Sequence, residues 1–222
     1  EYDHFIWDNG SSDETVEWLA GITNPTEYEK GDITLDSPLE GSGNYVYFSP
    51  ENVGLTEASN RLVDAIKEQD KHQIIIKIDN DCEFMTKGWL ESIVDLWKRN
   101  HKLYMSPYVE GLVHNPGGAP RVGHSFIGPY FVEVTYHIGG ICAAIDSSAY
   151  DEFRWTDKFL HGNQDREASD EFRKQGFMPM YMPLHRVKHM DTTEGQHEKF
   201  PEYFERRKKE KQTEYEPGTA QA

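Results

Sequence analysis

The sequence predicts an α/β fold in which a mostly parallel central sheet is flanked by helices and followed by a small antiparallel portion. Three apolar strand patterns, at residues 2–7, 45–48 and 74–79, are each followed by a polar turn and then by a helical pattern. Alternating units of this kind are typical of parallel strands joined by right-handed crossovers. Residues 131–136 instead alternate apolar and polar side chains, as antiparallel strands do. With 36% of its 222 residues hydrophobic, the chain can bury one sizeable core.

The first strand pattern, residues 2–7, runs directly into a polar turn that contains Asp8 and Asn9. Ser11 is followed three residues later by Glu14, which predicts a capping box at the start of a helix. The apolar positions of that short helix are Val16, Trp18 and Leu19. Asp8 therefore stands at the carboxyl end of a strand, although an ordinary Asx turn also explains Asp8 and Asn9 on local evidence.

Two more strand, turn and helix units follow. Residues 21–45 show little periodicity and are expected to form a connection with one short strand. The strand at 45–48 then leads through a polar turn at 49–54 into a helix with its apolar face at Leu55, Ala58, Leu62, Ala65 and Ile66. The strand at 74–79 is followed by a helix that opens after Gly88 and buries Trp89, Ile93, Leu96 and Trp97.

The second half of the chain changes character after the strand at 103–105. A loop is predicted at 115–120, and further strands are predicted at 131–136, 141–146 and 177–182. A helix at 165–175 is closed by Gly176, at the position expected just past a helix end. The highly charged stretch 202–212 is expected to be a solvated helix. We expect one domain over residues 1–198 and a charged tail over residues 199–222.

Two carboxylates, Asp79 and Asp81, come directly after the β-branched run Ile74–Ile78. In open α/β sheets, ligands bind beyond the carboxyl ends of the strands, and if the strand extends to Asp81, alternation places both side chains on one face. Paired carboxylates form a hard oxygen site for Mg²⁺ or Mn²⁺, which keeps open positions for phosphates. The triplet alone is weak evidence in a chain with 39 acidic residues, but its place after a buried strand predicts a metal-bridged diphosphate.

Composition and charge exclude several classes of partner. The formal net charge of −16 argues against nucleic acid or an anionic membrane surface, because clustered Lys and Arg bind such phosphates. An anionic nucleotide would then need a cation. Cys82 and Cys142 follow no metal-binding spacing and are expected to be reduced core thiols in a reducing compartment. No run is long and apolar enough to span a bilayer, so a soluble, cytoplasmic protein is expected.

Five motifs in one order resemble the GT-A glycosyltransferases, in particular the large family-2-like group that uses nucleotide sugars. The segments that carry the resemblance are Asp8–Asp13, Asn52–Gly54 with Asn60, Asp79–Asp81, Gln164–Asp165 with Arg173–Gly176, and Leu184–His189. They span most of the chain. The resemblance implies a GT-A, Rossmann-like fold with a nucleotide-sugar-binding half over residues 1–105 and an acceptor half over residues 106–198. The family's usual first strand and helix have no counterpart here, so this chain is expected to start at the second strand.

The resemblance also implies roles for individual residues. Asp8 would recognise the nucleobase, Asp79 the ribose and phosphates, and Asp165 would be the catalytic base. Asp79, Asp81 and His189 would contact the metal ion. The remaining donor-binding positions would be Asn9, Asn52, Gly54, Asn60 and Asn80.

Sugar transfer from a nucleotide requires charge stabilisation on the departing diphosphate and a base for the acceptor hydroxyl. A carboxylate at a helix start, such as Asp165, could take that proton over the opposite face of the sugar, which inverts the anomeric centre; alternatively it only complements the helix dipole. We therefore predict an inverting, Mn²⁺- or Mg²⁺-dependent glycosyltransferase that moves a UDP-linked sugar to an acceptor hydroxyl. One alternative is a nucleotide-sugar-binding module without activity, because Gln164 stands where the family usually carries an acid. Another is a metal-dependent nucleotidyltransferase or phosphohydrolase.

Overall fold

The computed structural model describes residues 2–23, 33–39, 42–111, 119–156 and 164–190, together with residues 201, 202 and 205. The chain divides into two compact units. The first comprises Glu1–His72 with Arg154–Lys158, and the second comprises Gln73–Phe153 with Phe159–Ala222. This division leaves the predicted single domain over residues 1–198 as a prediction. Among the described helices, none is long and apolar enough to cross a membrane.

The first unit contains a three-stranded sheet in the order β1-β3-β2 and two helices. Its elements are β1 (His4–Asp8), α1 (Thr15–Thr23), β2 (Ile33–Leu39), β3 (Ser42–Phe48) and α2 (Leu55–Glu68). β1 and β3 are parallel, as the strand, turn and helix repeat predicts, whereas β2 pairs antiparallel with β3. α1 packs on β3 and α2 packs on β1. The buried side chains Leu19, Val46, Ala58 and Val63 form the core of this unit.

The helix α1 starts later than the sequence predicts. It begins at Thr15, whose backbone N–H donates to Oδ1 of Asp13 at 3.0 Å, and the N–H of Ser11 donates to Oδ2 of Asp8 at 3.1 Å. The predicted capping box of Ser11 and Glu14 is therefore wrong. The hydrogen bond from the Ser11 N–H to Asp8 places Ser11 in the turn after β1, before the helix begins. Trp18 is 65% exposed, so it is not one of the buried positions of the helix either.

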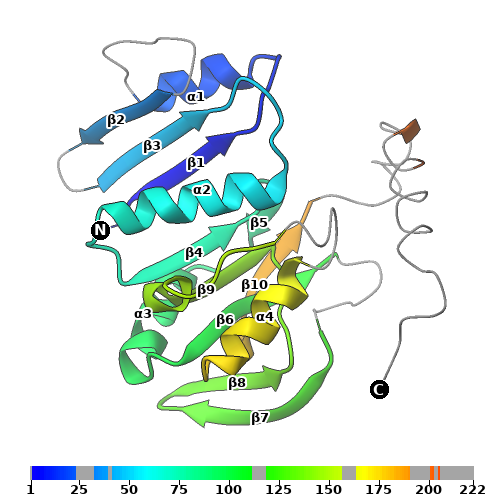
Figure 1. Ribbon diagram of the computed structural model, residues 1–222. Coiled ribbons are helices and arrows are strands. Elements are labelled where there is room, and N and C mark those ends of the chain that lie inside the picture. The colour runs from blue at the N-terminus through cyan, green and yellow to red at the C-terminus, as the bar shows by residue number, and fades with distance from the viewer. Residues whose placement is uncertain are drawn as a thin grey trace. The chain divides into compact units, whose positions relative to one another are not determined.

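The second unit is built on a sheet in the order β4-β9-β6-β10-β8-β7, with β5 paired to β10. Its strands are β4 (Ile74–Ile78), β5 (Cys82–Phe84), β6 (Leu103–Glu110), β7 (Arg121–Ile127), β8 (Tyr130–Thr135), β9 (Cys142–Asp146) and β10 (Met178–His189). Its helices are α3 (Trp89–Arg99), the 3-10 turn η1 (Ser147–Tyr150) and α4 (Gln164–Lys174). Figure 1 labels the strands of this unit and its helices α3 and α4.

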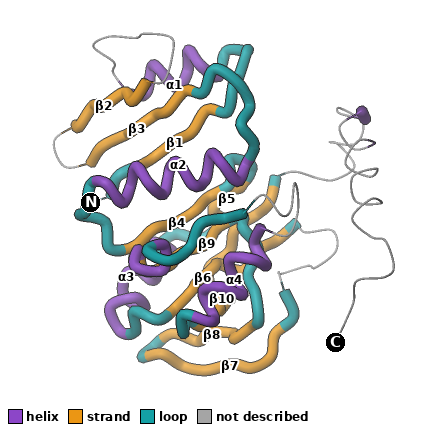
Figure 2. The backbone as a smooth tube through the Cα atoms, viewed as in Figure 1, coloured by secondary structure: helices purple, strands orange, loops and turns teal. Residues whose placement is uncertain are grey.

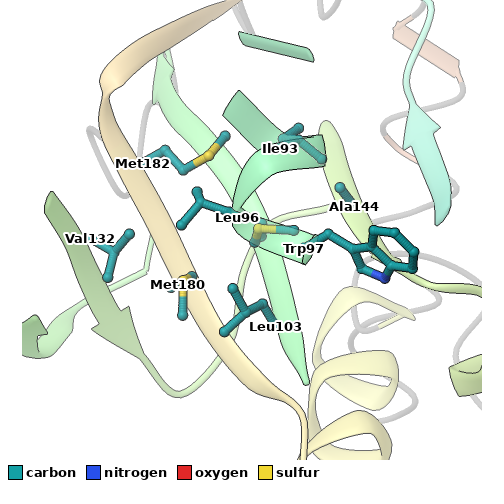
Figure 3. Close-up of a cluster of buried hydrophobic side chains, with 9 residues drawn as sticks. Ile93, Leu96, Trp97, Leu103, Val132, Ala144, Met180 and Met182 are labelled. Atoms are coloured by element: carbon teal, nitrogen blue, oxygen red, sulfur yellow. The ribbon is translucent and has the colours of Figure 1, made fainter. Parts of the chain in front are cut away.

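The two faces of this sheet carry different helices. Leu103 and Met105 of β6 pack against α3, in a cluster that also contains the buried side chains Ile93, Leu96, Trp97, Val132, Ala144, Met180 and Met182 (Figure 3). Tyr104 lies between them in the sequence, so alternation turns its ring to the other face, where it meets Phe172 of α4 at a centroid distance of 5.1 Å. Truncating a fully buried residue such as Leu96 to alanine would cost about 2–5 kcal/mol of stability.

The α/β fold class with a central sheet flanked by helices is confirmed, but the strand pairing is more antiparallel than predicted. Among the described strands, two pairings are parallel, β1 with β3 and β6 with β10, and the other six are antiparallel. β9 inserts antiparallel between β4 and β6, and the pairs β2 with β3, β7 with β8, β8 with β10 and β5 with β10 supply the other antiparallel contacts. Most of the predicted loop at 115–120 and of the predicted helix at 202–212 lies outside the described residues.

Candidate functional site

In the first unit, two polar loops follow the parallel strands β1 and β3. We call residues Asp8–Ser12 and Ser49–Gly54 the donor loops; they run side by side (Figure 2). Asn9 joins them, because its Oδ1 accepts the Val53 N–H at 2.8 Å and its Nδ2 donates to Oδ1 of Asn52 at 3.0 Å. A Cβ at Gly10, where φ is +82°, would lie 2.8 Å from the Glu51 backbone, so this close approach requires glycine.

Asp8 is 5% exposed and lies at the end of β1. Its Oδ2 accepts the Ser11 N–H, while its Oδ1 makes no hydrogen bond within the part of the chain that the structure describes. The Oδ1 of Asn52 also accepts the N–H of Gly54, at 2.9 Å. Asp8 therefore combines the predicted Asx-type turn with a carboxylate oxygen that is left for another donor.

Asn60 lies on α2 and makes a two-way pair with the backbone of Trp155. Its Nδ2 donates to the Trp155 carbonyl at 2.9 Å, and its Oδ1 accepts the Trp155 N–H at 3.0 Å. Both polar ends of the amide are thus used within the first unit. This pairing gives Asn60 a structural role, because it holds residues 154–155 on the unit. Its predicted contact with the donor stays a prediction.

In the second unit, Asp79, Asn80 and Asp81 form the turn between β4 and β5. β4 ends at Ile78, so strand geometry does not reach Asp81 and the two carboxylates meet different partners. Oδ1 of Asp79 accepts from the ammonium of Lys77, while its backbone N–H donates to the Ile141 carbonyl at 2.9 Å. Asn80 is exposed.

Asp81 is paired with His189, which comes from the far end of the sequence. Nε2 of His189 lies 3.1 Å from Oδ2 of Asp81. The pairing depends on β10, which shifts register between Met182 and Arg186 against β6 and then pairs antiparallel with β5, placing His189 opposite Cys82. The N–H of Met190 also donates to the Asp81 carbonyl at 2.6 Å.

A metal ion at this turn needs several oxygen or nitrogen ligands. Within the described ranges, no three or more His, Cys, Asp or Glu side chains gather closely enough to hold one. However, Oδ1 of Asp81 is buried and has no hydrogen-bond partner among the described residues, which is costly unless a cation or a donor satisfies it. A carboxylate oxygen and an imidazole nitrogen are suitable ligands for Mn²⁺ or Mg²⁺. Asp81 and His189 therefore fit a site with two protein ligands, whereas the carboxylate of Asp79, the third predicted ligand, is paired with the Lys77 ammonium in this structure. Its contact with the metal ion stays a prediction.

Asp165 lies in the first turn of α4 and is held by the loop before β9. The backbone N–H of Gly140 donates to its carboxylate, and a Cβ at Gly140 would overlap Oδ1 of Asp165. Burial raises the pKa of Asp165, the nearby Asp79 adds to this, and Lys77, the Gly140 N–H and His137 oppose it. A partly exposed carboxylate with a raised pKa is suited to accept a proton.

The segment His137–Gly140, which we call the cradle loop, is anchored from three elements. Ile138 N–H donates to Oγ of Ser169 on α4 at 3.3 Å, and Gly139 N–H donates to Oη of Tyr181 on β10 at 3.3 Å. The Lys77 ammonium on β4 donates to the Gly140 carbonyl at 2.8 Å. The cradle loop therefore connects Asp79, through Lys77, with Asp165.

The family model for "Glycosyl transferase family 2" matches residues 1–154, which is more than half of the chain. The chain belongs to glycosyl transferase family 2. The predicted resemblance to the family-2-like GT-A glycosyltransferases is therefore confirmed. The match includes the donor loops and the turn at Asp79–Asp81, whereas Asp165 and His189 lie beyond it.

Two solved structures share the fold of this family member. One is GalNAc-T7 in complex with UDP, GalNAc and Mn²⁺, at 15% identity and a TM-score of 0.55. The similarity covers 85% of this chain but only 42% of the GalNAc-T7 chain. The other is A197 from STIV, at 10% identity and a TM-score of 0.50, with 85% of each chain covered. Comparison with curated protein sequences gives no match.

Sequence reasoning missed three residues of this candidate site: Lys77, Gly140 and Tyr181. The sequence did contain a signal for Lys77, because a lysine interrupts an otherwise all-isoleucine strand. The pair Gly139–Gly140 before a strand was a weaker signal for a close backbone approach. Tyr181 had none, because a buried tyrosine in a strand is ordinary core until its hydroxyl partners are known.

Proposed function

We propose that this glycosyltransferase moves a sugar from a UDP-linked donor to an acceptor hydroxyl, with inversion at the anomeric centre and with Mn²⁺ or Mg²⁺. The observation that carries the proposal is the pair of features in the second unit: a carboxylate of raised pKa, Asp165, and the Asp81–His189 pair with its unsatisfied carboxylate oxygen. The GalNAc-T7 complex with UDP and Mn²⁺ supports the same classes of nucleotide and cation here.

Asp8 is proposed to recognise the nucleobase. Its Oδ1 is available while Oδ2 is held by Ser11, so one oxygen is oriented and the other can accept the N–H of a uracil ring. Asn9, Asn52 and Gly54 then act by shaping the donor loops around Asp8, since Asn9 and Asn52 use side-chain atoms to join them. Asp79 and Asn80 are kept as proposed contacts to the ribose and phosphates.

Asp81 and His189 are proposed to hold the divalent cation, whose remaining ligands would be diphosphate oxygens and water. A cation there would stabilise the negative charge that develops on the departing diphosphate. Oδ2 of Asp81 lies 3.1 Å from Nε2 of His189, and the Met190 N–H holds the backbone of Asp81. This pairing supports the assignment of both side chains to one site.

Asp165 is proposed to remove the proton of the acceptor hydroxyl as that oxygen attacks the anomeric carbon. Gly140 N–H stabilises and orients the carboxylate, and the surrounding protein raises its pKa toward the operating pH, which favours proton transfer. Attack from the side of Asp165, opposite the diphosphate, would invert the anomeric centre.

Calorimetric titration with UDP tests the donor and cation parts together. Because the chain carries a net charge of −16, UDP should bind measurably in Mn²⁺ and at least about tenfold more weakly in EDTA. Asp81→Asn should lose most of the Mn²⁺-dependent gain, whereas Glu83→Gln removes an exposed carboxylate from adjacent β5 and should retain it. Equal UDP affinity in Mn²⁺ and EDTA would remove the cation from the mechanism. Binding of donor without any transfer or slow donor hydrolysis would favour the inactive binding module.

A further inference from the structure

Lys77 is a charged residue in a strand that should be apolar. The other residues of β4 are isoleucines, and the Lys77 side chain is only 21% exposed. Across the sheet Lys77 faces Ala143 of β9, whose small side chain leaves room beside the lysine stem. A lysine with so little exposure requires partners for its ammonium group.

The Lys77 ammonium has two oxygen partners, and each belongs to the candidate site. It donates to Oδ1 of Asp79 and, at 2.8 Å, to the carbonyl of Gly140. Asp79 is itself 35% exposed, so its carboxylate lies where a ligand can reach it. A divalent cation bound at the site would be a second positive charge for Asp79.

An ammonium and a divalent cation exclude one another at the same carboxylate. Both need the oxygen lone pairs of Asp79, and they repel each other at short range. We propose that Lys77 is a resident counter-ion that competes with the divalent cation for Asp79, so that the cation binds tightly only together with the nucleotide diphosphate. This inference rests on the proposed metal-dependent transfer.

The diphosphate changes the balance because it brings both negative charge and oxygen ligands. Its oxygens can complete the coordination that Asp81 and His189 begin and can accept hydrogen bonds from the ammonium. In the free protein, in contrast, the Lys77 ammonium neutralises the charge of Asp79 without a metal ion. A purely structural Lys77, which only anchors the Gly140 carbonyl, would have no such effect on metal affinity.

Mn²⁺ titration of the full chain without nucleotide, followed by electron paramagnetic resonance of free Mn²⁺, separates these two roles. Lys77→Met should bind Mn²⁺ about tenfold more tightly than the parent, the order expected when one competing charge leaves a carboxylate. Lys77→Arg keeps the positive charge and should match the parent. The double variant Lys77→Met with Asp79→Asn should return to parental affinity, because the gain depends on Asp79.

Unchanged or weaker Mn²⁺ binding in Lys77→Met overturns the proposal, as does a gain that persists in the double variant. Lys77→Gln serves the same comparison if Lys77→Met does not fold, as judged by circular dichroism. The UDP titration in Mn²⁺ and EDTA distinguishes a failure of the Lys77 proposal from a failure of the proposed function. If UDP binding by the parent depends on Mn²⁺ but Lys77→Met shows no gain in Mn²⁺ affinity, only the role of Lys77 is wrong. If UDP binding by the parent does not depend on Mn²⁺, the proposed metal-dependent function is wrong.

Discussion

The donor loops of the first unit and the carboxylates of the second unit use their polar groups in opposite ways. In the donor loops, Asn9 and Asn52 are hydrogen-bonded to each other and to the backbone of Val53 and Gly54. In the second unit, Asp81 keeps a buried oxygen without a partner in the described chain, and burial raises the pKa of Asp165. The first region uses polar side chains to hold its shape, whereas the second holds charges that its own structure does not fully compensate.

From this difference we expect the second unit to carry out the chemistry and the first unit to recognise the donor. Amides whose oxygens are already hydrogen-bonded stabilise a loop and offer a ligand few acceptors, so the first unit is expected to bind through few atoms, chiefly Asp8. Uncompensated carboxylates are costly in the free protein and gain most when a cation, a proton or a substrate arrives. Substitutions in the second unit should therefore affect turnover more than substitutions in the first.

The largest effect is expected for Asp165→Asn. The amide retains the size of the side chain but cannot accept the acceptor proton, so transfer should fall by about 10² to 10⁴ while UDP affinity is retained. Turnover and UDP affinity, measured side by side, check this. Asp170→Asn on the exposed side of α4 is the matched control and should transfer at the parental rate. Parental transfer by Asp165→Asn would mean that the base lies elsewhere.

Gly140→Ala should have the next largest effect. An added Cβ overlaps Oδ1 of Asp165 and must move the carboxylate, and a displacement of about 1 Å can cost about 10²-fold in rate. Gly139→Ala is the control, because nothing lies within 4 Å of its added Cβ. Turnover numbers of the two variants, with circular dichroism to confirm folding, provide the test. Equal turnover in both variants would show that the cradle loop does not position Asp165.

Asp8→Ala tests recognition in the first unit. Loss of one charge-assisted hydrogen bond to uracil should weaken UDP binding by about 1–3 kcal/mol, with little change in the rate of transfer at saturating donor. Calorimetry with UDP measures the loss, and Glu17→Ala, which removes an exposed carboxylate from α1, serves as the control. If Asp8→Ala binds UDP as the parent does, Asp8 is only a turn residue.

The smallest effect concerns stability and pH. Burial raises the folded-state pKa of Asp165 above its ordinary value of 3.8, so the folded protein favours the protonated acid. The contribution of Asp165 to the free energy of unfolding is fully present below pH 3.8 and is lost as pH rises through the raised pKa. Ionised Asp165 therefore destabilises the fold at neutral pH. Asp165→Asn should therefore raise Tm slightly at pH 7, and the gain should vanish under acidic conditions. A lower Tm at pH 7 would contradict the cause assigned to the shift.

The sequence alone determined the order of elements, the strand β4 with carboxylates directly after it, and the family. These features are local: β-branched runs, helical spacing and turn residues act over a few neighbours, and the motifs are read in chain order. Asp8 at the end of β1, Asp79 and Asp81 after β4, and Asp165 in the first turn of α4 all follow from such signals. The capping box failed because Ser11 had a competing partner, the carboxylate of Asp8, that spacing rules do not weigh.

Only the tertiary structure decided which charges meet. The register shift in β10 brings His189 to Asp81, the pairing of β4 with β9 brings Lys77 toward the cradle loop, and the absence of a side chain at Gly140 admits Asp165. Each of these contacts joins residues that are far apart in the chain, so no local pattern encodes it. The physical reason is that electrostatic and steric interactions depend on distance in space, and sheet pairing sets that distance only after the whole unit has folded.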